Sequence, residues 1–121
     1  MEGKYKNTLG AYGENLAAEF LLRHRFKILT RNFRVRGAEL DIIAIKENAV
    51  YFVEVKTRKG DTYGTPELAI HYYKQRHMQF AAQIFIAKNP QYAENEMHFS
   101  SLSVMINVMQ SKINFRFFSD I

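Results

Sequence analysis

The chain has 121 residues, a formal net charge of +5 and no cysteine. Its length predicts one domain spanning residues 1–121, and the missing cysteines exclude disulfides, thiolate metal sites and a cysteine nucleophile. No stretch approaches the ~20 apolar residues that cross a bilayer, and the polar, basic residues 1–8 lack the apolar core of a signal peptide. We therefore expect a cytoplasmic protein without a membrane partner.

A first helix is predicted from residue 8 or 9 to about residue 24. Its apolar stripe at helical spacing consists of Leu16, Ala17, Phe20 and Leu21. Glu14 lies three residues before Ala17 and seven before Leu21, so its carboxylate shares the inward side of the helix. That placement is unusual for an acid.

A one-sided basic segment follows this helix. No acid lies between Phe20 and Ala38. The basic residues of the stretch are Arg23, Arg25, Lys27, Arg31, Arg34 and Arg36. Such a block indicates a polyanion as partner, and on charge alone a solvated basic face explains it equally well.

Residues 26–36 are predicted to form a strand or a strand followed by a loop, with aliphatic and aromatic residues interleaved with arginines. Two further strands are predicted over residues 39–45 and 49–57, the latter rich in β-branched and aromatic residues. Gly37 separates the first two strands, and residues 46–48 are too few for anything but a hairpin turn. A second helix is predicted from Thr65-Pro66-Glu67 to about Lys88. Its predicted buried side consists of Leu68, Tyr72, Tyr73, Phe80, Ala81, Ile84 and Phe85.

The last elements are predicted to be two strands, residues 99–109 and 112–118, that form a hairpin turning at Gln110-Ser111. The predicted pairs are Val108 with Ile113, Ile106 with Phe115, and Val104 with Phe117. The order helix, three strands, helix, two strands predicts an α/β or α+β domain.

The hairpin of residues 39–57 brings acids together. A turn centred between Glu47 and Asn48 places Asp41 directly opposite Glu54, and Glu39 opposite Lys56. The period of two puts all four side chains on one face of the sheet. Like charges at opposed strand positions repel, so two facing carboxylates among apolar residues predict a bound divalent cation.

Magnesium, with manganese as the alternative, suits this pair because Mg²⁺ accepts one or two carboxylates and keeps waters for substrate phosphates. Lys56 would stabilise developing charge or help to deprotonate a water. The rival interpretation is an exposed acid pair beside an ordinary Glu39–Lys56 ion pair worth less than ~1 kcal/mol. The opposed geometry and the inward Glu14 favour the metal site.

Glu14 is a candidate third ligand or substrate contact. The small neighbours Gly10, Ala11 and Gly13 would let a strand or a phosphate approach closely. The alternative for Glu14 is a favourable interaction with the helix dipole, worth ~0.3–1 kcal/mol. Further candidate phosphate contacts are Arg58 and Lys59, after the Glu54 strand, and Lys74 and Arg76 on the second helix; a solvated surface explains them equally well.

Several motifs in order resemble one family. They are Gly13-Glu14 with Ala17, Ile28-Leu29-x-Arg31-Asn32-x-Arg34, Glu39-Leu40-Asp41-Ile42-Ile43-Ala44, Phe52-Val53-Glu54-Val55-Lys56-Thr57-Arg58 and Lys74-Gln75-Arg76. Across residues 9–87 the chain resembles the YraN-type bacterial proteins, which are related to Holliday-junction resolvases and restriction endonucleases. The resemblance implies an α/β, restriction-endonuclease-like core: a mixed five-stranded sheet flanked by helices in the order α-β-β-β-α-β-β.

The resemblance also implies that Glu14, Asp41, Glu54 and Lys56 align with the acid, acid, acid and lysine positions of the nucleases, and by analogy it suggests a homodimer. The resulting hypothesis is a Mg²⁺-dependent endonuclease that hydrolyses DNA, branched or otherwise structured. Asp41, Glu54 and Glu14 would serve the metal, and Arg31, Arg34, Arg36, Arg58, Lys59, Lys74 and Arg76 would hold the DNA backbone. Two rivals are a nucleic-acid-binding module of the same fold without activity and a protein-interaction domain with a basic face.

Overall fold

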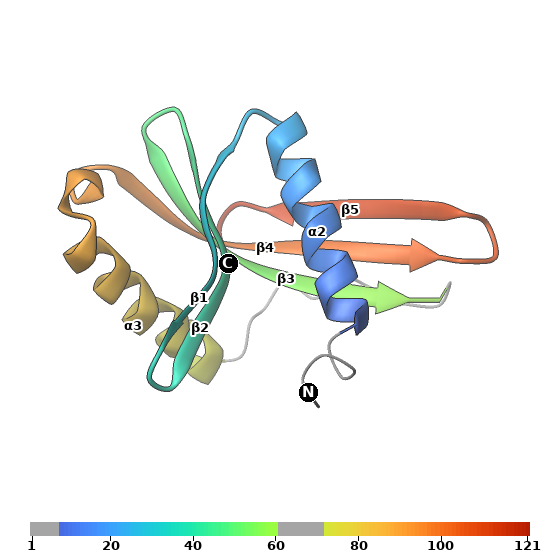
Figure 1. Cartoon of the computed structure of the whole chain (residues 1–121), viewed down its shortest axis with the longest axis horizontal. Coiled ribbons are helices and arrows are strands. Elements are labelled where there is room, and N and C mark those ends of the chain that lie inside the picture. Colours follow the sequence, from blue (N-terminus) through green and yellow to red (C-terminus); the bar gives the residue numbers. More distant parts are fainter. Residues whose placement is uncertain (1–7, 61–71) are drawn as a thin grey trace.

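A computed structural model describes residues 8–60 and 72–121 of the chain (Figure 1). Its elements are α2 (Thr8–Arg23), β1 (Lys27–Val35), β2 (Ala38–Lys46), β3 (Ala49–Lys59), α3 (Tyr72–Lys88), the short 3-10 helix η1 (Pro90–Tyr92), β4 (Glu96–Asn107) and β5 (Lys112–Phe118). The predicted order of helices and strands is confirmed. The predicted start of the second helix, at residues 65–67, lies outside the described residues.

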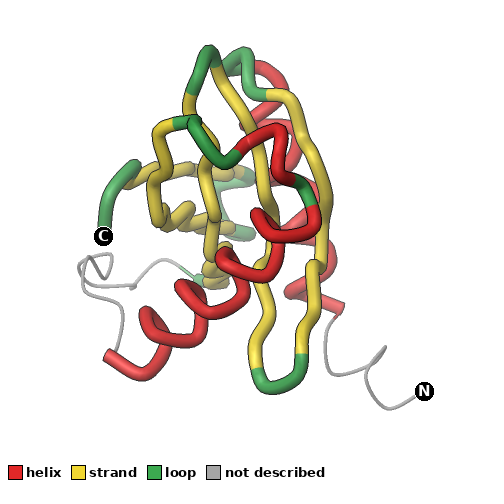
Figure 2. Tube along the Cα trace, turned by 90° about the vertical axis from the view of Figure 1, so that its left-hand side faces the viewer, coloured by secondary structure: helices red, strands yellow, loops and turns green. Residues whose placement is uncertain are grey.

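The strands form one mixed five-stranded sheet in the order β1-β2-β3-β4-β5. Antiparallel ladders join β1 to β2, β2 to β3 and β4 to β5, whereas β3 and β4 are parallel. A parallel pair requires a crossover, and α3 lies in this connection. The two helices cover opposite faces of the sheet, with α3 in front and α2 behind in Figure 2. This architecture is consistent with the nuclease-like α/β core that the motifs imply.

Each helix buries its own core against the sheet. Under α2 the buried side chains include Ala17, Leu21, Ile42, Val53 and Val104. Under α3 they include Leu40, Phe52, Met78, Ala81 and Phe85. Strands covered on both faces need apolar residues on both sides, which explains the nearly continuous apolar runs of β2 and β3.

The predicted buried side of the second helix is partly wrong. Tyr73 is 66% exposed and Phe80 is 48% exposed, whereas Met78 and Ala82 are buried. The buried positions Met78, Ala81, Ala82 and Phe85 follow helical spacing. The prediction followed the aromatic residues and was therefore displaced around the helix axis.

The predicted register of the last hairpin is also wrong, by two residues. The observed pairs are Asn107 with Lys112, Ile106 with Ile113, and Val104 with Phe115. The Asn107 side-chain oxygen accepts a hydrogen bond from the Gln110 backbone N–H at 3.0 Å, and Ser111 has a positive φ of 52°. A shift of two keeps every side chain on its face, so apolar alternation alone does not distinguish the two registers.

Gly13 allows α2 to approach β3. A Cβ atom at Gly13 would overlap the side chain of Thr57, whereas a Cβ at Gly10 of the same helix would meet nothing within 4 Å. Gly13→Ala is therefore expected to lower the free energy of unfolding by about 1–3 kcal/mol. The matched change Gly10→Ala is expected to raise it by about 0.5–1 kcal/mol through helix propensity. Urea unfolding measures both values, and equal stability of the two variants would contradict this account.

Candidate functional site

The site forms where β2 and β3 stop pairing. The β2–β3 ladder runs from Lys46↔Ala49 to Ile42↔Val53, which is the predicted register. Asp41 and Glu54 are the next residues on the two strands. The Asp41 Oδ2 atom accepts a hydrogen bond from the Val55 backbone N–H at 2.7 Å, so a side chain continues the contact between the strands beyond the ladder.

The pairing of β2 with its other neighbour, β1, is also interrupted at Asp41. The β1–β2 ladder pairs Arg31 with Ile42 and Phe33 with Leu40, which brackets Asn32 and Asp41. Asn32 has a positive φ of 54°, a conformation that asparagine tolerates better than most residues. Leu40 packs in the core under α3 and Ile42 in the core under α2, so the side-chain alternation of β2 changes phase at Asp41. Glu39 alternates with Leu40 and so faces the side of α2, whereas Glu54 and Lys56 share the α3 face of Phe52. The prediction that all four charged residues lie on one face is therefore wrong, and the ladder does not include the predicted pairs Asp41–Glu54 and Glu39–Lys56.

Asp41 is surrounded by other carboxylates. Burial raises its pKa most, and the charge of Glu54 raises it further, whereas the hydrogen bond from the Val55 N–H lowers it. The charges of Glu14 and Glu39 add smaller increases, and the resulting pKa of Asp41 is about 7. Asp41 is therefore the centre of the predicted acids, because it interacts electrostatically with both Glu54, which faces α3, and Glu14 on α2.

Glu54 forms an ion pair with Lys74, a residue for which the sequence predicted a different role. The Lys74 ammonium of α3 lies 3.1 Å from Glu54 Oε2, and the Glu54 side chain is only 13% exposed. Lys74 was predicted as a contact to a DNA backbone, and its contact with Glu54 was missed. Lys74 is separated from Glu54 by the crossover, so no local pattern signals that the two side chains meet.

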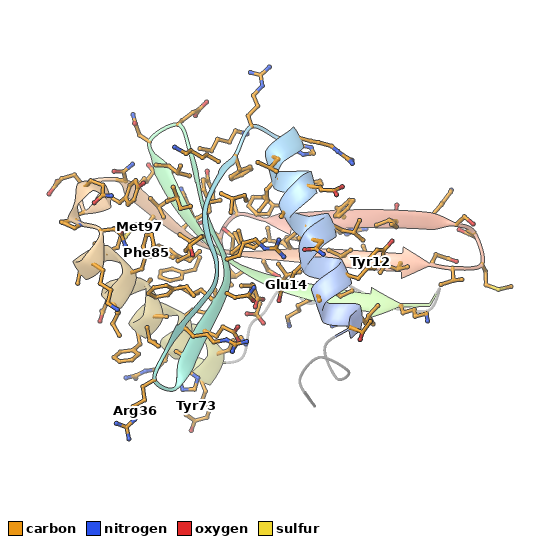
Figure 3. The ribbon with its side chains drawn as sticks, viewed as in Figure 1. Tyr12, Glu14, Arg36, Tyr73, Phe85 and Met97 are labelled. Carbon is orange, nitrogen blue, oxygen red and sulfur yellow. The ribbon has the colours of Figure 1, made fainter. Side chains whose placement is uncertain are left out.

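Glu14 projects from α2 near the β1–β2 hairpin (Figure 3). Its Oε1 atom lies 4.0 Å from Nη2 of Arg31, and the same Nη2 donates a hydrogen bond to the Asn15 side-chain oxygen at 2.8 Å. Burial raises the pKa of Glu14, as does the charge of Glu39, while Arg31 and a hydrogen bond from Asn32 lower it. Glu14 is thus half-buried and inward-facing, as its helical position predicted.

The remaining candidate residues divide into three groups. Arg34 pairs with Glu39 through an Nε–Oε2 contact of 3.0 Å and so joins Arg31 and Lys74 among the basic residues that contact the acids. Lys56 and Arg58 follow Glu54 at intervals of two on β3, so they share its face and are half-buried. The exposed basic residues are Arg36 near the tip of the β1–β2 hairpin (Figure 3), Lys59 at the end of β3 and Arg76 on α3.

Two hollows flank the cluster. One of about 230 Å³ is lined by Gly10, Ala11, Glu14, Asn32, Arg34 and Glu39. The other, of about 360 Å³, is lined by Arg34, Val35, Gly37, Ala38, Glu39, Lys74 and His77. Arg34 and Glu39 border both hollows, whereas Asp41 and Glu54 line neither of the two.

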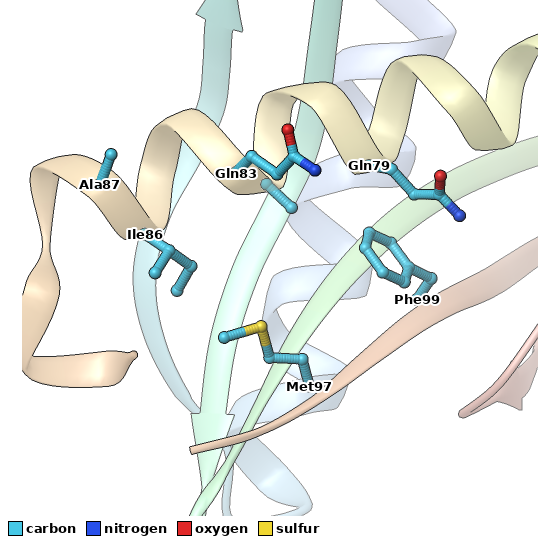
Figure 4. A pocket seen from close by; sticks show the side chains of 7 residues that line it. Gln79, Gln83, Ile86, Ala87, Met97 and Phe99 are labelled. Atoms are coloured by element: carbon cyan, nitrogen blue, oxygen red, sulfur yellow. The ribbon is translucent and has the colours of Figure 1, made fainter. Parts of the chain in front are cut away.

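A third hollow, of about 480 Å³, lies between α3 and the start of β4 (Figure 4). Its lining residues are Gln79, Ala82, Gln83, Ile86, Ala87, Met97 and Phe99. This lining contains no charged side chain.

The cluster is not arranged as a ready-made metal site. Within residues 8–60 and 72–121, no three Asp, Glu, His or Cys side chains stand close enough to hold one ion. Glu54 faces Lys74, and one oxygen of Asp41 accepts from Val55. Two carboxylates at adjacent strand positions are nevertheless the hard oxygen donors that suit Mg²⁺, which needs few protein ligands.

Fold and site together define an α/β domain whose core is consistent with those of nucleases and whose acids gather where two central strands separate. In the described part of the chain, no helix has the length and apolar character needed to span a membrane. The model of the "Uncharacterised protein family UPF0102" matches residues 13–111. The chain belongs to this family, which confirms the resemblance to the YraN-type proteins.

Individual relatives agree with the family match. A UPF0102 protein of Geobacter metallireducens is 49% identical over 87 residues, which cover 72% of this chain and 71% of the relative. A UPF0102 protein of Caldicellulosiruptor saccharolyticus is 44% identical over 104 residues, covering 85% and 86% of the two chains. One of Syntrophomonas wolfei is 39% identical over 106 residues, covering 88% and 91%.

Proposed function

We propose that this protein is a metal-dependent nuclease that hydrolyses phosphodiester bonds in branched or otherwise structured DNA. The observation that supports this proposal most strongly is the carboxylate cluster at the fork between β2 and β3. Burial and the nearby acids raise the pKa of Asp41 to about 7. A divalent cation would remove the repulsion within this cluster.

Asp41 and Glu54 are the proposed ligands of Mg²⁺ or Mn²⁺, with Glu14 as a further contact through a coordinated water, since no three carboxylates of the described residues stand close enough to bind one ion directly. The bound ion would polarise the phosphate and lower the pKa of a coordinated water. Lys56 shares the face of Glu54 and would position this water or stabilise the charge that develops on the phosphate. The Lys74 ammonium lies against Oε2 of Glu54 and would compete with a cation there, and an incoming phosphate is a suitable new partner for this ammonium.

The basic residues around the cluster would hold the DNA backbone. Arg31, Arg34 and Lys74 contact the acids, whereas Arg36, Arg58, Lys59 and Arg76 would extend the basic surface. Binding through such residues releases counterions from DNA and weakens steeply as salt rises. The proposal also includes a cytoplasmic location and, by analogy with Holliday-junction resolvases, a homodimer.

Incubation with labelled linear duplex, flap, four-way junction and RNA substrates tests the activity. We expect cleavage of a DNA substrate with Mg²⁺ or Mn²⁺, and complete loss of cleavage when EDTA removes the metal. Binding measured in Ca²⁺ or EDTA should fall by at least about tenfold between 50 and 200 mM salt.

Other results would select the rival functions. Salt-sensitive DNA binding without cleavage in any metal would indicate a binding module, the alternative that the Lys74–Glu54 contact favours. If no nucleic acid retains the protein at low salt, both the nuclease and the binding module would be excluded. This result would indicate a protein-interaction domain.

A further inference from the structure

Ser101 is a buried hydroxyl beside the candidate site. Its side chain is 0% exposed, and its Oγ atom has no hydrogen-bond partner among the described residues. Its neighbour Ser100 is equally buried, but the Ser100 hydroxyl donates to the Ser119 carbonyl oxygen at 2.7 Å. Burying a polar group without a hydrogen-bond partner costs free energy. The Ser101 hydroxyl would recover this cost if it gained a partner in the functional state of the site.

The strand register places Ser101 next to Glu54. These two residues are partners in the parallel β3–β4 ladder, two positions after the partners Phe52 and Phe99. The rings of Phe52 and Phe99 stack at 5.3 Å and pack in the core under α3. Because side chains alternate along a strand, Glu54 and Ser101 point to that same face, with neighbouring strands ~4.8 Å apart.

The contact between Glu54 and Lys74 confirms this face, because Lys74 reaches Glu54 from α3. Ser100 lies on the opposite face, since it alternates with Ser101. Glu54 therefore has an ammonium from the helix and an unpaired hydroxyl on the adjacent strand within its surroundings.

We propose that Ser101 is a positioning residue for Glu54. When a divalent cation replaces the Lys74 ammonium, the Ser101 hydroxyl donates a hydrogen bond to the Glu54 carboxylate and fixes its orientation toward the cation. This inference rests on the proposed metal-dependent function. Carboxylates that bind metals are commonly oriented by such second hydrogen bonds, and their loss weakens metal binding.

The competing explanation is that a small residue is simply required at this position. In that case Ser101→Ala would leave metal binding unchanged, because alanine is also small. The two explanations therefore differ in metal affinity, which is measured without any cleavage reaction.

Titration calorimetry with Mn²⁺, together with thermal unfolding in EDTA, separates the two explanations. Ser101→Ala should weaken Mn²⁺ binding by about fivefold to tenfold, while the metal-free melting temperature stays equal to or above that of the parent. The matched control Ser100→Ala should bind Mn²⁺ like the parent and melt at a lower temperature, since it loses a satisfied hydrogen bond.

Unchanged Mn²⁺ affinity in Ser101→Ala would overturn the inference. This failure is distinguishable from failure of the proposed function through Asp41→Asn. If the parent binds Mn²⁺, Asp41→Asn does not, and Ser101→Ala binds like the parent, only the role of Ser101 is wrong. If the parent binds no Mn²⁺, or Asp41→Asn binds it equally well, the metal site and the role of Ser101 are both wrong.

Discussion

Glu54→Gln is expected to reduce the proposed metal-dependent DNA cleavage by at least about 100-fold, because the variant removes one of the two proposed central metal ligands. Glutamine keeps the size of the side chain but replaces a charged oxygen by a neutral amide. The Glu54 side chain is only 13% exposed and contacts Lys74 at 3.1 Å, so the variant also leaves the ammonium without its counter-charge. That second effect should lower stability modestly without unfolding the chain.

Single-turnover cleavage at saturating enzyme measures this loss, and circular dichroism checks that the fold persists. The matched control is Glu19→Gln, which neutralises an exposed acid paired with Arg23 on α2, away from the sheet. Glu19→Gln should cleave within about twofold of the parent, since exposed ion pairs contribute little. A Glu54→Gln protein that cleaves at a rate near that of the control would remove Glu54 from the catalytic site.

Local rules predicted the register of β2 with β3 as far as the observed ladder extends, but not its end before the predicted pairs Asp41–Glu54 and Glu39–Lys56. The short β2–β3 connection fixes one register, and the observed pairs from Lys46↔Ala49 to Ile42↔Val53 follow it. The inward position of Glu14 followed from helical periodicity. These predictions depend on residues close in sequence, for which few alternative arrangements exist.

The surroundings of the acids depend on tertiary packing and were not predictable in the same way. Lys74 reaches Glu54 only because α3 crosses the sheet between β3 and β4. The phase change of β2 at Asp41 and the positive φ of Asn32 depend on how the chain is packed between two cores. Ser101 sits beside Glu54 through a parallel pairing, whose register no hairpin turn fixes.

The stability of the metal-free protein should decrease as pH rises from about 4 to about 7. Asp41 has a reference pKa of 3.8 and a pKa of about 7 in the folded chain. Between these two pH values, Asp41 keeps its proton in the folded state and has lost it in the unfolded state. The favourable contribution of protonated Asp41 to the free energy of unfolding is therefore fully present below pH ~4 and disappears as pH rises through ~7. Asp41→Asn removes this contribution, because asparagine is neutral at every pH.

At pH 8 in EDTA, Asp41→Asn should therefore be more stable than the parent by about 2–4 kcal/mol, and the difference should vanish near pH 4. Urea unfolding at several pH values measures it. The control Glu94→Gln neutralises an exposed acid between η1 and β4 and should follow the parent curve. A parent that is as stable as Asp41→Asn at pH 8 would show that Asp41 ionises without penalty.

Saturating Mn²⁺ should make the parent more stable than Asp41→Asn at pH 8, the reverse of the order expected in EDTA. A cation binds the ionised form of Asp41, so the Mn²⁺ affinity of the parent should rise by about tenfold per pH unit below pH 7 and level off above it. Saturating Mn²⁺ should then stabilise the parent at pH 8 and leave Asp41→Asn unchanged. Burial and the nearby acids disfavour the ionised form of Asp41 in EDTA, and a bound cation would favour that same form. An Asp41→Asn variant that is stabilised in EDTA and does not respond to Mn²⁺ would link both effects to this side chain.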